Sequence, residues 1–185
     1  MGTKAIRIKN CDGVYAPEED SYLIEEAVRK YAYGKTLDIG TGTGILGIAA
    51  AQEGCDVTFS DINDKALECA RINAKENGVR GRFIESDLFK NIQGKFNTVI
   101  FNPPYLPPDG RRQTPMDTAT YGGMNGREII DRFLREYLLH VEDDHVILLL
   151  ESSLNGYTKD TDAMNAEIVC RGSQFFEELV VLKFK

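Results

Sequence analysis

Asp38-Ile39-Gly40-Thr41-Gly42-Thr43-Gly44 stands where a predicted strand, residues 36–39, runs into a predicted helix, residues 45–53. Alternating glycines let the backbone turn tightly and approach a ligand with no Cβ in the way. Residues 42–47 also satisfy the Gly-x-Gly-x-x-Gly spacing of dinucleotide-binding loops. The stretch therefore predicts a site for a nucleotide-type cofactor, although the glycines alone do not identify it. A tight turn that binds nothing is the alternative.

Strands and helices alternate on both sides of this loop. A helix is predicted over residues 17–33, where apolar residues recur at helical spacing after Pro17 and three acidic residues. Apolar runs and periodicity predict further strands at residues 56–60, 82–85, 97–101 and 145–150, helices at residues 64–77 and 129–138, and an antiparallel strand pair at residues 167–170 and 179–184. This order is typical of an α/β fold: a Rossmann-like, doubly wound, mostly parallel seven-stranded sheet with a C-terminal antiparallel strand pair.

The chain of 185 residues predicts a single domain. Within it we expect residues 1–34 to form a short N-terminal strand, at residues 5–9, followed by a helix, and residues 35–185 to form the catalytic core. Residues 155–165 show little apolar periodicity, so a short helix or a loop is expected there.

The composition argues against a dedicated nucleic-acid-binding protein, a membrane protein and a secreted protein. With 22 basic against 29 acidic residues the net charge is −7, which disfavours a dedicated nucleic-acid binder because neutralising phosphates takes Lys and Arg. No apolar stretch is long enough to cross a membrane and the N-terminus lacks the apolar segment of a signal peptide, so we expect a cytoplasmic protein. The scattered cysteines predict neither a disulfide nor a metal site; they are Cys11, Cys55, Cys69 and Cys170.

Carboxylates follow the next two strands at the same edge of the predicted sheet. Asp61 ends the second strand, about 20 residues after the glycines, where a carboxylate can accept hydrogen bonds from both ribose hydroxyls. Asp87 follows the third strand and suits a hydrogen bond from an adenine amino group, with Leu88 packed on the ring. The alternatives are Asp61 as the N-cap of the next helix, a role that Asn63 also suits, and Asp87 as a solvated loop residue.

Asn102-Pro103-Pro104-Tyr105 follows the fourth strand and indicates the chemistry. The prolines hold the backbone extended and remove two N–H donors. Two acceptors remain, the Asn102 side-chain oxygen and the Pro103 carbonyl, beside the flat ring of Tyr105, and together they suit a planar –NH2 group. A proline-rich turn without a ligand is the alternative.

Such an arrangement makes a planar nitrogen more nucleophilic, because accepting hydrogen bonds from both N–H bonds raises its electron density and aims it at an electrophile. The sulfonium methyl of S-adenosylmethionine is a matching electrophile and needs no metal, whereas a hydride-transfer enzyme has no use for this arrangement. We therefore expect S-adenosylmethionine as the cofactor and Asn102, Pro103 and Tyr105 as catalytic residues.

These residues resemble the class I, S-adenosylmethionine-dependent amino-methyltransferases. The resemblance is closer to the HemK-type glutamine N5-methyltransferases, which modify the Gly-Gly-Gln glutamine of peptide-chain release factors. Its most specific pieces are residues 14–21 (VYAPEEDS), 102–105 (NPPY) and 121–133 (YGGMNGREIIDRF). The resemblance implies that Asn102 holds the glutamine amide, and that Ser21 and Asp38 join a cofactor pocket made with Gly40, Gly42, Asp61, Asp87, Leu88 and Asn102.

The likeness is to the short archaeal and eukaryotic branch of this family. Bacterial members resemble this domain with a helical substrate-recognition domain in front of it, and the roughly 35 residues before Asp38 are too few for one. The short branch is similar to enzymes that pair with a small zinc-binding activator subunit, so the resemblance implies such a partner besides the release factor. Two departures are Asp38, where the family often has Glu, and a shortened segment before Glu167.

Two other functions stay open. A nucleic-acid base amino-methyltransferase, acting on adenine N6 or guanine N2, would use the same residues 102–105 with a different docking surface; the negative charge counts against it. A cofactor-binding but inactive scaffold subunit would have no chemical need for those residues. Target choice is expected to come from another subunit or from residues 102–126, a loop rich in Pro and Gly that contains Arg111 and Arg112.

Overall fold

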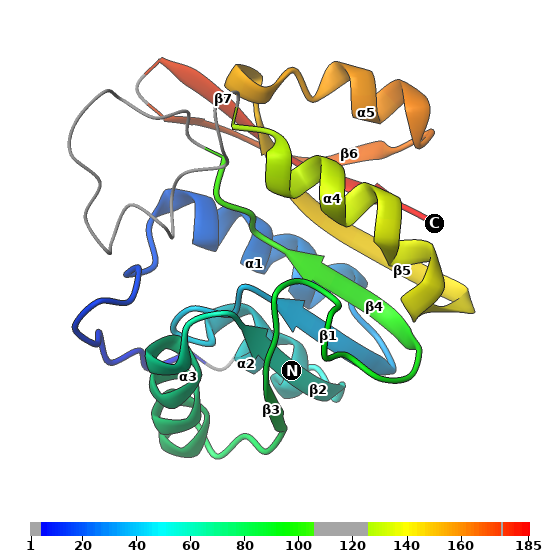
Figure 1. Ribbon diagram of the computed structural model, residues 1–185. Helices are drawn as coiled ribbons and strands as arrows, with labels where there is room; N and C mark the ends of the chain where they lie inside the picture. The colour runs from blue at the N-terminus through cyan, green and yellow to red at the C-terminus, as the bar shows by residue number, and fades with distance from the viewer. Residues whose placement is uncertain (1–4, 106–125, 175) are drawn as a thin grey trace.

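The glycine-rich loop connects the central strand of the sheet, β1 (Lys35–Ile39), to α2 (Ile45–Gln52). The computed structural model describes residues 5–105, 126–174 and 176–185. Its other strands are β2 (Asp56–Asp61), β3 (Arg82–Glu85), β4 (Phe96–Phe101), β5 (Val141–Ser152), β6 (Glu167–Gln174) and β7 (Glu177–Phe184). They form a seven-stranded sheet of order β3-β2-β1-β4-β5-β7-β6 (Figure 1).

The sheet has the predicted topology. Strands β1 to β5 run parallel, and β7 pairs antiparallel with both β5 and β6. The chain moves outward from β1 to β3 and then returns to the other side of β1 with β4, so the strand order reverses between β1 and β4. At such a reversal the segments that follow the two strands diverge and leave a crevice at their carboxyl ends. The fold therefore places the glycine loop and residues 102–105 around one crevice.

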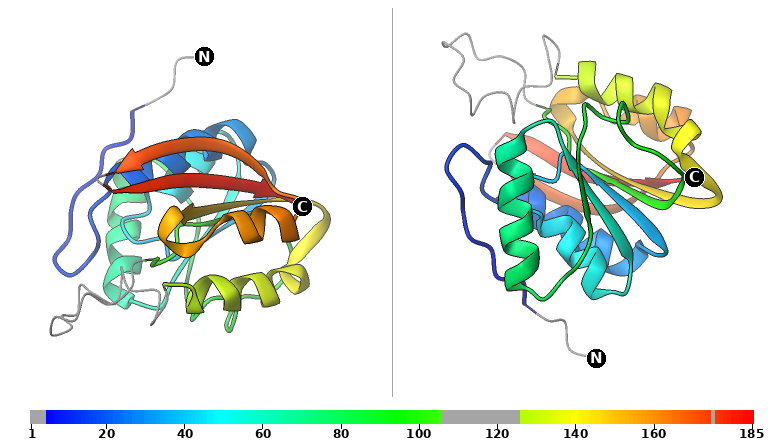
Figure 2. Two further views of the ribbon diagram at one scale, coloured as in Figure 1. Left: turned by 90° about the horizontal axis from the view of Figure 1, so that it is seen from above. Right: turned by 60° about the horizontal axis from the view of Figure 1, so that its bottom comes forward.

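Helices cover both faces of the sheet. Helices α1 (Glu19–Tyr31), α2 and α3 (Asp64–Glu76) lie on one face, and α4 (Glu128–Glu136) and α5 (Thr158–Ala163) lie on the other (Figure 2). The central strands are buried between these layers, as residues 147–150 of β5 show with no exposed surface. Helix α5 gives the segment over residues 155–165 a short helix, one of the two predicted alternatives.

The prediction of a strand at residues 5–9 is wrong. This segment runs alongside α3 (Figure 2) and its backbone bonds to side chains instead of to a neighbouring strand. Asn77 accepts the Arg7 N–H and donates to the Arg7 carbonyl, and Asn73 makes the same pair of hydrogen bonds with Lys9. The segment is extended, as its alternating apolar residues predict. Residues two apart in such a segment, Arg7 and Lys9, lie beside residues four apart on one face of a helix, Asn77 and Asn73. The partner of this segment is therefore a helix.

The same stripe of α3 continues into a disulfide between Cys11 and Cys69, which corrects the expectation that the cysteines are unpaired. Cys69 lies one helical turn before Asn73, and Cys11 lies two residues after Lys9. The two cysteines are 58 residues apart in sequence, so no short spacing motif signals their pairing. The bond follows from the packing of the N-terminal segment on α3, which only the tertiary structure reveals.

Loss of this disulfide should lower the thermal stability of the protein. A cross-link across 58 residues restricts the unfolded chain and contributes about 4 kcal/mol in the chain-entropy model, or about 10 °C in melting temperature for a domain of this size. We expect dithiothreitol to lower the melting temperature of the wild type by that order and to leave a Cys11→Ser/Cys69→Ser variant unchanged. Identical wild-type melting curves with and without the reductant would contradict the bond.

The other two cysteines, Cys55 and Cys170, are free and half-buried. Burial raises the pKa of both thiols. Over the described ranges no group of three or more His, Cys, Asp or Glu side chains is placed to bind a metal ion. The same ranges contain no helix long and apolar enough to cross a membrane.

Candidate active site

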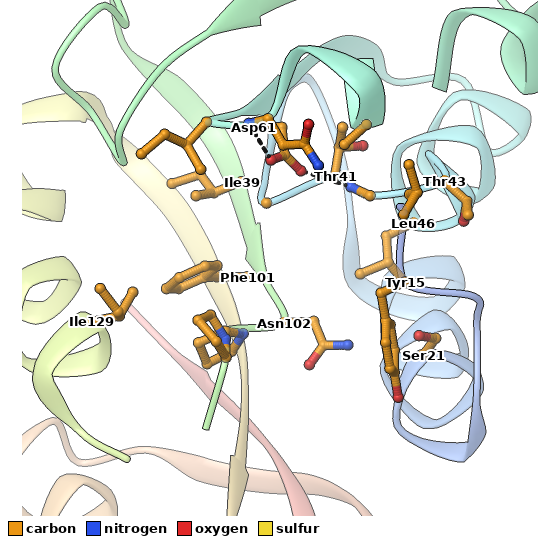
Figure 3. A pocket seen from close by; sticks show the side chains of 18 of the residues that line it. Tyr15, Ser21, Ile39, Thr41, Thr43, Leu46, Asp61, Phe101, Asn102 and Ile129 are labelled. Carbon is orange, nitrogen blue, oxygen red and sulfur yellow. Dashed lines mark hydrogen bonds between the residues drawn. The ribbon is translucent and has the colours of Figure 1, made fainter. Parts of the chain in front are cut away.

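A cavity of about 740 Å³ opens at the carboxyl ends of β1 and β4, where the strand order reverses. Its walls come from the segment before α1 and the start of α1, the loops after β1, β2, β3 and β4, and the first two turns of α4. Figure 3 shows Asn102 between Tyr15 and Ser21 on one side and Phe101 and Ile129 on the other. The cavity brings together all but one of the predicted site residues: Ser21, Gly40, Gly42, Asp61, Asp87, Leu88, Asn102, Pro103 and Tyr105.

The glycine loop forms the wall between β1 and α2. Gly42 has a φ of +53°, a conformation that favours glycine. Gly47, in the first turn of α2, lies so close to β2 that a Cβ would sit 2.3 Å from the Phe59 ring. Gly42 thus permits the tight turn and Gly47 the close packing of α2, and α2 begins at the cavity as a result.

Asp38 is the predicted site residue that the cavity does not include. It is fully buried behind the glycine loop, where its Oδ2 accepts hydrogen bonds from the Thr41 hydroxyl and, at 2.9 Å, from the Gly47 N–H. Its Oδ1 has no hydrogen-bond partner within the described part of the chain, and burial raises the pKa of the carboxyl to about 7. Asp38 holds the loop from behind, and a direct contact with the cofactor stays a prediction.

Asp61, at the end of β2, lies in the wall beside the glycine loop (Figure 3). Its Oδ2 accepts the Gly42 N–H at 3.0 Å and its Oδ1 accepts the Asn63 N–H at 2.9 Å, while burial raises its pKa. Asn63 is the residue that caps α3, because its side chain accepts the Lys65 N–H. Each oxygen of Asp61 retains a lone pair, so the carboxylate can still accept hydrogen bonds from ribose hydroxyls.

Asp87 and Leu88 line the cavity after β3, and Asp87 has a partner that the sequence pattern did not indicate. Arg132 reaches it from α4, with Nη2 of Arg132 lying 3.0 Å from Oδ2 of Asp87. Both side chains remain about one third exposed, so the pair contributes little to stability. It leaves Oδ1 of Asp87 for the predicted adenine contact, which remains a prediction.

Asn102 presents an unused acceptor at the centre of the cavity. Its Nδ2 donates to Oδ2 of Asp20 at 2.9 Å. Because a carboxylate can only accept, the amide nitrogen must face Asp20 and the amide oxygen must face the other way. That oxygen is buried and has no hydrogen-bond partner in the described ranges. A buried acceptor without a partner is costly, so the site is ready for an N–H donor.

Asp20 is a residue of this candidate site that the sequence patterns did not predict. It is 3% exposed, and its Oδ1 accepts the Ser21 N–H at 2.7 Å and the Tyr15 hydroxyl at 3.3 Å. A signal was present, since Asp20 precedes the buried Ile24 by four residues and Ala27 by seven. That spacing puts an acidic residue on the inward face of α1. Burying a carboxylate there is costly unless a polar group pairs with it.

Two tyrosines, Tyr15 and Tyr105, line the cavity together with Asn102. Tyr105 is 8% exposed, and burial, followed by the negative charges of Asp20 and Glu177, raises the pKa of its hydroxyl. Burial and the charges of Asp20 and Glu18 likewise raise the pKa of Tyr15. Both side chains therefore stay uncharged. Each offers a flat ring and a hydroxyl donor, which suits a planar, neutral group as the acceptor of the methyl group.

These features fit the expected methyl donor and acceptor as two halves of one cavity. The glycine loop, Asp61 and Asp87 line the part of the cavity that is predicted to bind the cofactor. Asn102 and Tyr105 line the part that is predicted to bind a planar –NH2 group, and the partnerless Oδ1 of Asn102 is consistent with that prediction.

The chain is similar to proteins of known sequence. Residues 5–116 match the family model of the methyltransferase small domain. The chain belongs to this family of methyltransferases. It is 38% identical over 187 residues to a Methanocaldococcus jannaschii protein named "Putative protein N5-glutamine methyltransferase", covering 97% of this chain and 95% of that protein. A release factor glutamine methyltransferase of Deinococcus radiodurans is 38% identical over 117 residues, which cover 58% of this chain and 42% of that protein.

The fold of this methyltransferase also matches a solved structure over nearly its whole length. The E. cuniculi Mtq2–Trm112 complex, described as responsible for the methylation of the eRF1 translation termination factor, superposes with a TM-score of 0.74 at 25% identity. The match covers 94% of this chain and 98% of that one. A Rossmann-like methyltransferase fold is thereby confirmed.

The predicted target-choice loop lies largely outside the described residues. Of residues 102–126, the structure describes residues 102–105 and Gly126. Arg111, Arg112 and residues 121–125 of the 121–133 motif fall outside the part of the chain that the structure describes.

Replacing Asp61 should weaken cofactor binding by the methyltransferase. In Asp61→Ala the ribose hydroxyls lose a charged acceptor, worth about 1.5–3 kcal/mol, so we expect the dissociation constant for S-adenosylmethionine to rise about 10- to 100-fold by titration calorimetry. Asp64→Ala, three residues further on and exposed on α3, is the matched control and should leave the affinity unchanged. Equal affinities for Asp61→Ala and the wild type would remove Asp61 from the cofactor site.

Proposed function

We propose that this chain transfers the methyl group of S-adenosylmethionine to N5 of a glutamine side chain, the glutamine of the Gly-Gly-Gln sequence in a peptide-chain release factor. The observation that carries the proposal is the buried Oδ1 of Asn102, a residue of the cavity wall: Asp20 turns this oxygen away from itself, and it has no partner among the described residues. Tyr105 lies in the same wall. A primary amide is planar and carries two N–H bonds, so it satisfies this acceptor and packs against the ring.

The chain's own residues orient and activate the amide. One N–H donates to Oδ1 of Asn102 and the other to the Pro103 carbonyl, so the plane of the amide is fixed, and with it the direction of the nitrogen lone pair, which is perpendicular to that plane. Accepting both hydrogens raises electron density on a nitrogen that is otherwise a poor nucleophile, and holding the amide fixed removes much of the entropic cost of the reaction. The new N–CH3 bond forms as the S–CH3 bond of the sulfonium donor breaks, which leaves a neutral thioether, and the nitrogen releases one proton to water.

The cofactor half of the cavity positions the donor. S-adenosylmethionine supplies an electrophilic methyl group when it is bound. The glycine loop leaves room for it against the backbone, Asp61 accepts from the ribose, and Asp87 with Leu88 takes the adenine. Ser21 lies on the side of the cavity that the Asn102 amide nitrogen faces, because both residues hydrogen-bond to Asp20.

Several observations favour a protein glutamine as the acceptor. The M. jannaschii relative, aligned over almost the whole of both chains, is named for protein N5-glutamine methylation, and the E. cuniculi complex is described as methylating eRF1. The net charge of −7 disfavours a nucleic-acid substrate, whose phosphates would be repelled. A release factor acts during translation, so the cytoplasm is the compartment that this proposal requires.

A small partner subunit forms part of the proposal. The E. cuniculi protein is described in complex with Trm112, and the described part of this chain contains no separate substrate-recognition domain. We therefore infer that a small activator subunit, zinc-binding as the family resemblance implies, assists this chain. Co-purification of a small protein with the tagged chain from its native cells, with a gain in activity, is the expected result.

The acceptor is tested by following the radiolabelled methyl group of S-adenosylmethionine. We expect label in purified release factor and none in a release factor whose Gly-Gly-Gln glutamine is replaced by alanine. Ribosomal RNA and DNA are offered in parallel reactions. Label in either nucleic acid, with none in the release factor, would favour a base amino-methyltransferase, and label in no acceptor despite cofactor binding would favour an inactive scaffold.

A further inference from the structure

The backbone of Tyr105 is held by a side chain from a distant part of the chain. Asn155 is the last residue of η3 (Ser153–Asn155), the 3-10 turn that follows β5. Its Nδ2 donates to the Tyr105 carbonyl at 2.7 Å and to the Gly126 carbonyl at 3.1 Å. Asn155 is 5% exposed, so both hydrogen bonds are shielded from water. One buried amide therefore joins the end of residues 102–105 to the backbone that enters α4.

Gly126 allows these segments to meet. Its φ is +65°, and a Cβ at this position would lie 2.3 Å from the Tyr105 oxygen and 2.6 Å from Nδ2 of Asn155. No other residue type fits between the two without displacing one of them. The contact between these segments therefore depends on the residue type at two positions, Asn155 and Gly126.

Arg127 fixes Asn155 from the opposite side. Its Nη1 donates to the Asn155 carbonyl at 2.9 Å, and its Nη2 lies 2.7 Å from Oδ2 of Asp160 and 2.8 Å from Oδ1 of Asp131. The side chains of Arg127 and Asp160 are 15% and 5% exposed, so water screens this ion pair poorly. Charge-assisted hydrogen bonds to η3 and α4, together with the ion pair to α5, hold η3, α5 and the start of α4 as one unit.

The unit formed by η3, α5 and the start of α4 supports the part of the cavity that contains Asn102 and Tyr105. β4 ends at Phe101, and Pro103 and Pro104 have no N–H to donate, so the segment that ends in Tyr105 depends on its carbonyls and side chains for support. Asn155 holds the last of these carbonyls. Arg127 anchors α4, whose first turns supply Ile129 and Arg132 to the facing wall.

We propose that Asn155 is a positioning residue for the methyl acceptor, acting through Tyr105 by setting its ring against the plane of the bound amide. The inference rests on the proposed function, because it assumes that a planar amide lies against Tyr105. Asn155 does not line the cavity, so its effect on the acceptor is indirect. A shift of about 1 Å in a reacting group can cost about 100-fold in rate.

A double-mutant cycle between Asn155→Ala and Tyr105→Ala tests this inference. We expect Asn155→Ala to lower kcat/KM for the release factor about 10- to 100-fold and to leave the dissociation constant for S-adenosylmethionine within about twofold. In the double variant the loss should be little larger than in Tyr105→Ala alone, because two residues that act through one contact are not additive. Asn155→Ser, which keeps one hydroxyl donor, should show an intermediate loss.

Asn97→Ala is the matched structural control. Asn97 also ties two segments together, accepting the Lys35 N–H and donating to the Asp144 carbonyl, but it stands at the opposite end of β4 from the cavity. It should lower the melting temperature without a comparable change in kcat/KM. If Asn155→Ala does not fold, Asn155→Ser takes its place in the cycle.

The outcomes separate this inference from the proposed function. Additive losses in the cycle, or equal losses of kcat/KM in Asn155→Ala and Asn97→Ala, would overturn the positioning role while the wild type still methylates the release factor. Failure of the wild type on the release factor would overturn the proposed function instead. The cycle is then measured with the acceptor that carries the radiolabel, where non-additivity supports the role of Asn155 and additivity rejects it.

Discussion

Asn102→Ala should lower methyl transfer by about 1,000-fold or more while its affinity for S-adenosylmethionine stays within about twofold of the wild type. The substitution removes the buried Oδ1 that is left without a partner in the described structure, and with it one of the two acceptors for the substrate amide. The Pro103 carbonyl alone cannot fix the plane of the amide. The cofactor half of the cavity, formed by the glycine loop and Asp61, is untouched by the change.

The measurement pairs single-turnover rates at saturating cofactor with titration calorimetry. Asn10→Ala removes an exposed asparagine outside the cavity and is the matched control, with both quantities expected to equal those of the wild type. If Asn102→Ala loses cofactor binding together with transfer, then Asn102 acts in the cofactor site and its role as the acceptor of the substrate amide is wrong.

Asp20→Ala should lower kcat about 100-fold, the second largest effect that we expect. The carboxylate of Asp20 forces the amide of Asn102 to face it with its nitrogen, at 2.9 Å. Without the carboxylate, the Asn102 amide can rotate and present its –NH2 group to the cavity, where it repels the N–H bonds of the substrate. Asp20→Asn is a sharper variant because it keeps the shape and removes the charge that selects one orientation.

Both Asp20 variants are measured against Glu19→Ala, the exposed neighbour in the first turn of α1. We expect the Asp20 variants to lose activity while their cofactor affinity stays normal. We expect Glu19→Ala to keep a normal kcat. Wild-type kcat in Asp20→Asn would show that Asn102 is oriented by something other than this hydrogen bond.

Local sequence patterns were enough to predict the sheet and most of the site. Strand β3 lies at the predicted residues, and the cavity gathers Gly42, Asp61, Asp87 and Asn102 from four separate loops. The reason is topological: once the strands are known to be parallel, residues that follow them must share the carboxyl edge of the sheet. A residue that directly follows one of these strands in the sequence therefore lies at the edge of the sheet where the cavity opens.

The features that were missed depend on contacts between distant segments. The hydrogen bond from Asn102 to Asp20 spans 82 residues, and the Cys11–Cys69 disulfide spans 58. The strand predicted at residues 5–9 failed for the same reason, since alternation describes an extended chain and does not identify what lies beside it. Periodicity reports which face of an element is buried, and the partner on that face comes only from the tertiary structure.

The most direct test of the central claim is the position of the transferred methyl group. After incubation of the release factor with this protein and S-adenosylmethionine, tandem mass spectrometry of the peptide that contains Gly-Gly-Gln locates the methyl within the sequence. We expect one additional methyl on the side-chain amide of that glutamine, and none when Asn102→Ala replaces the wild type. A methyl on another residue, or an unmodified release factor beside methylated RNA or DNA, would contradict the central claim.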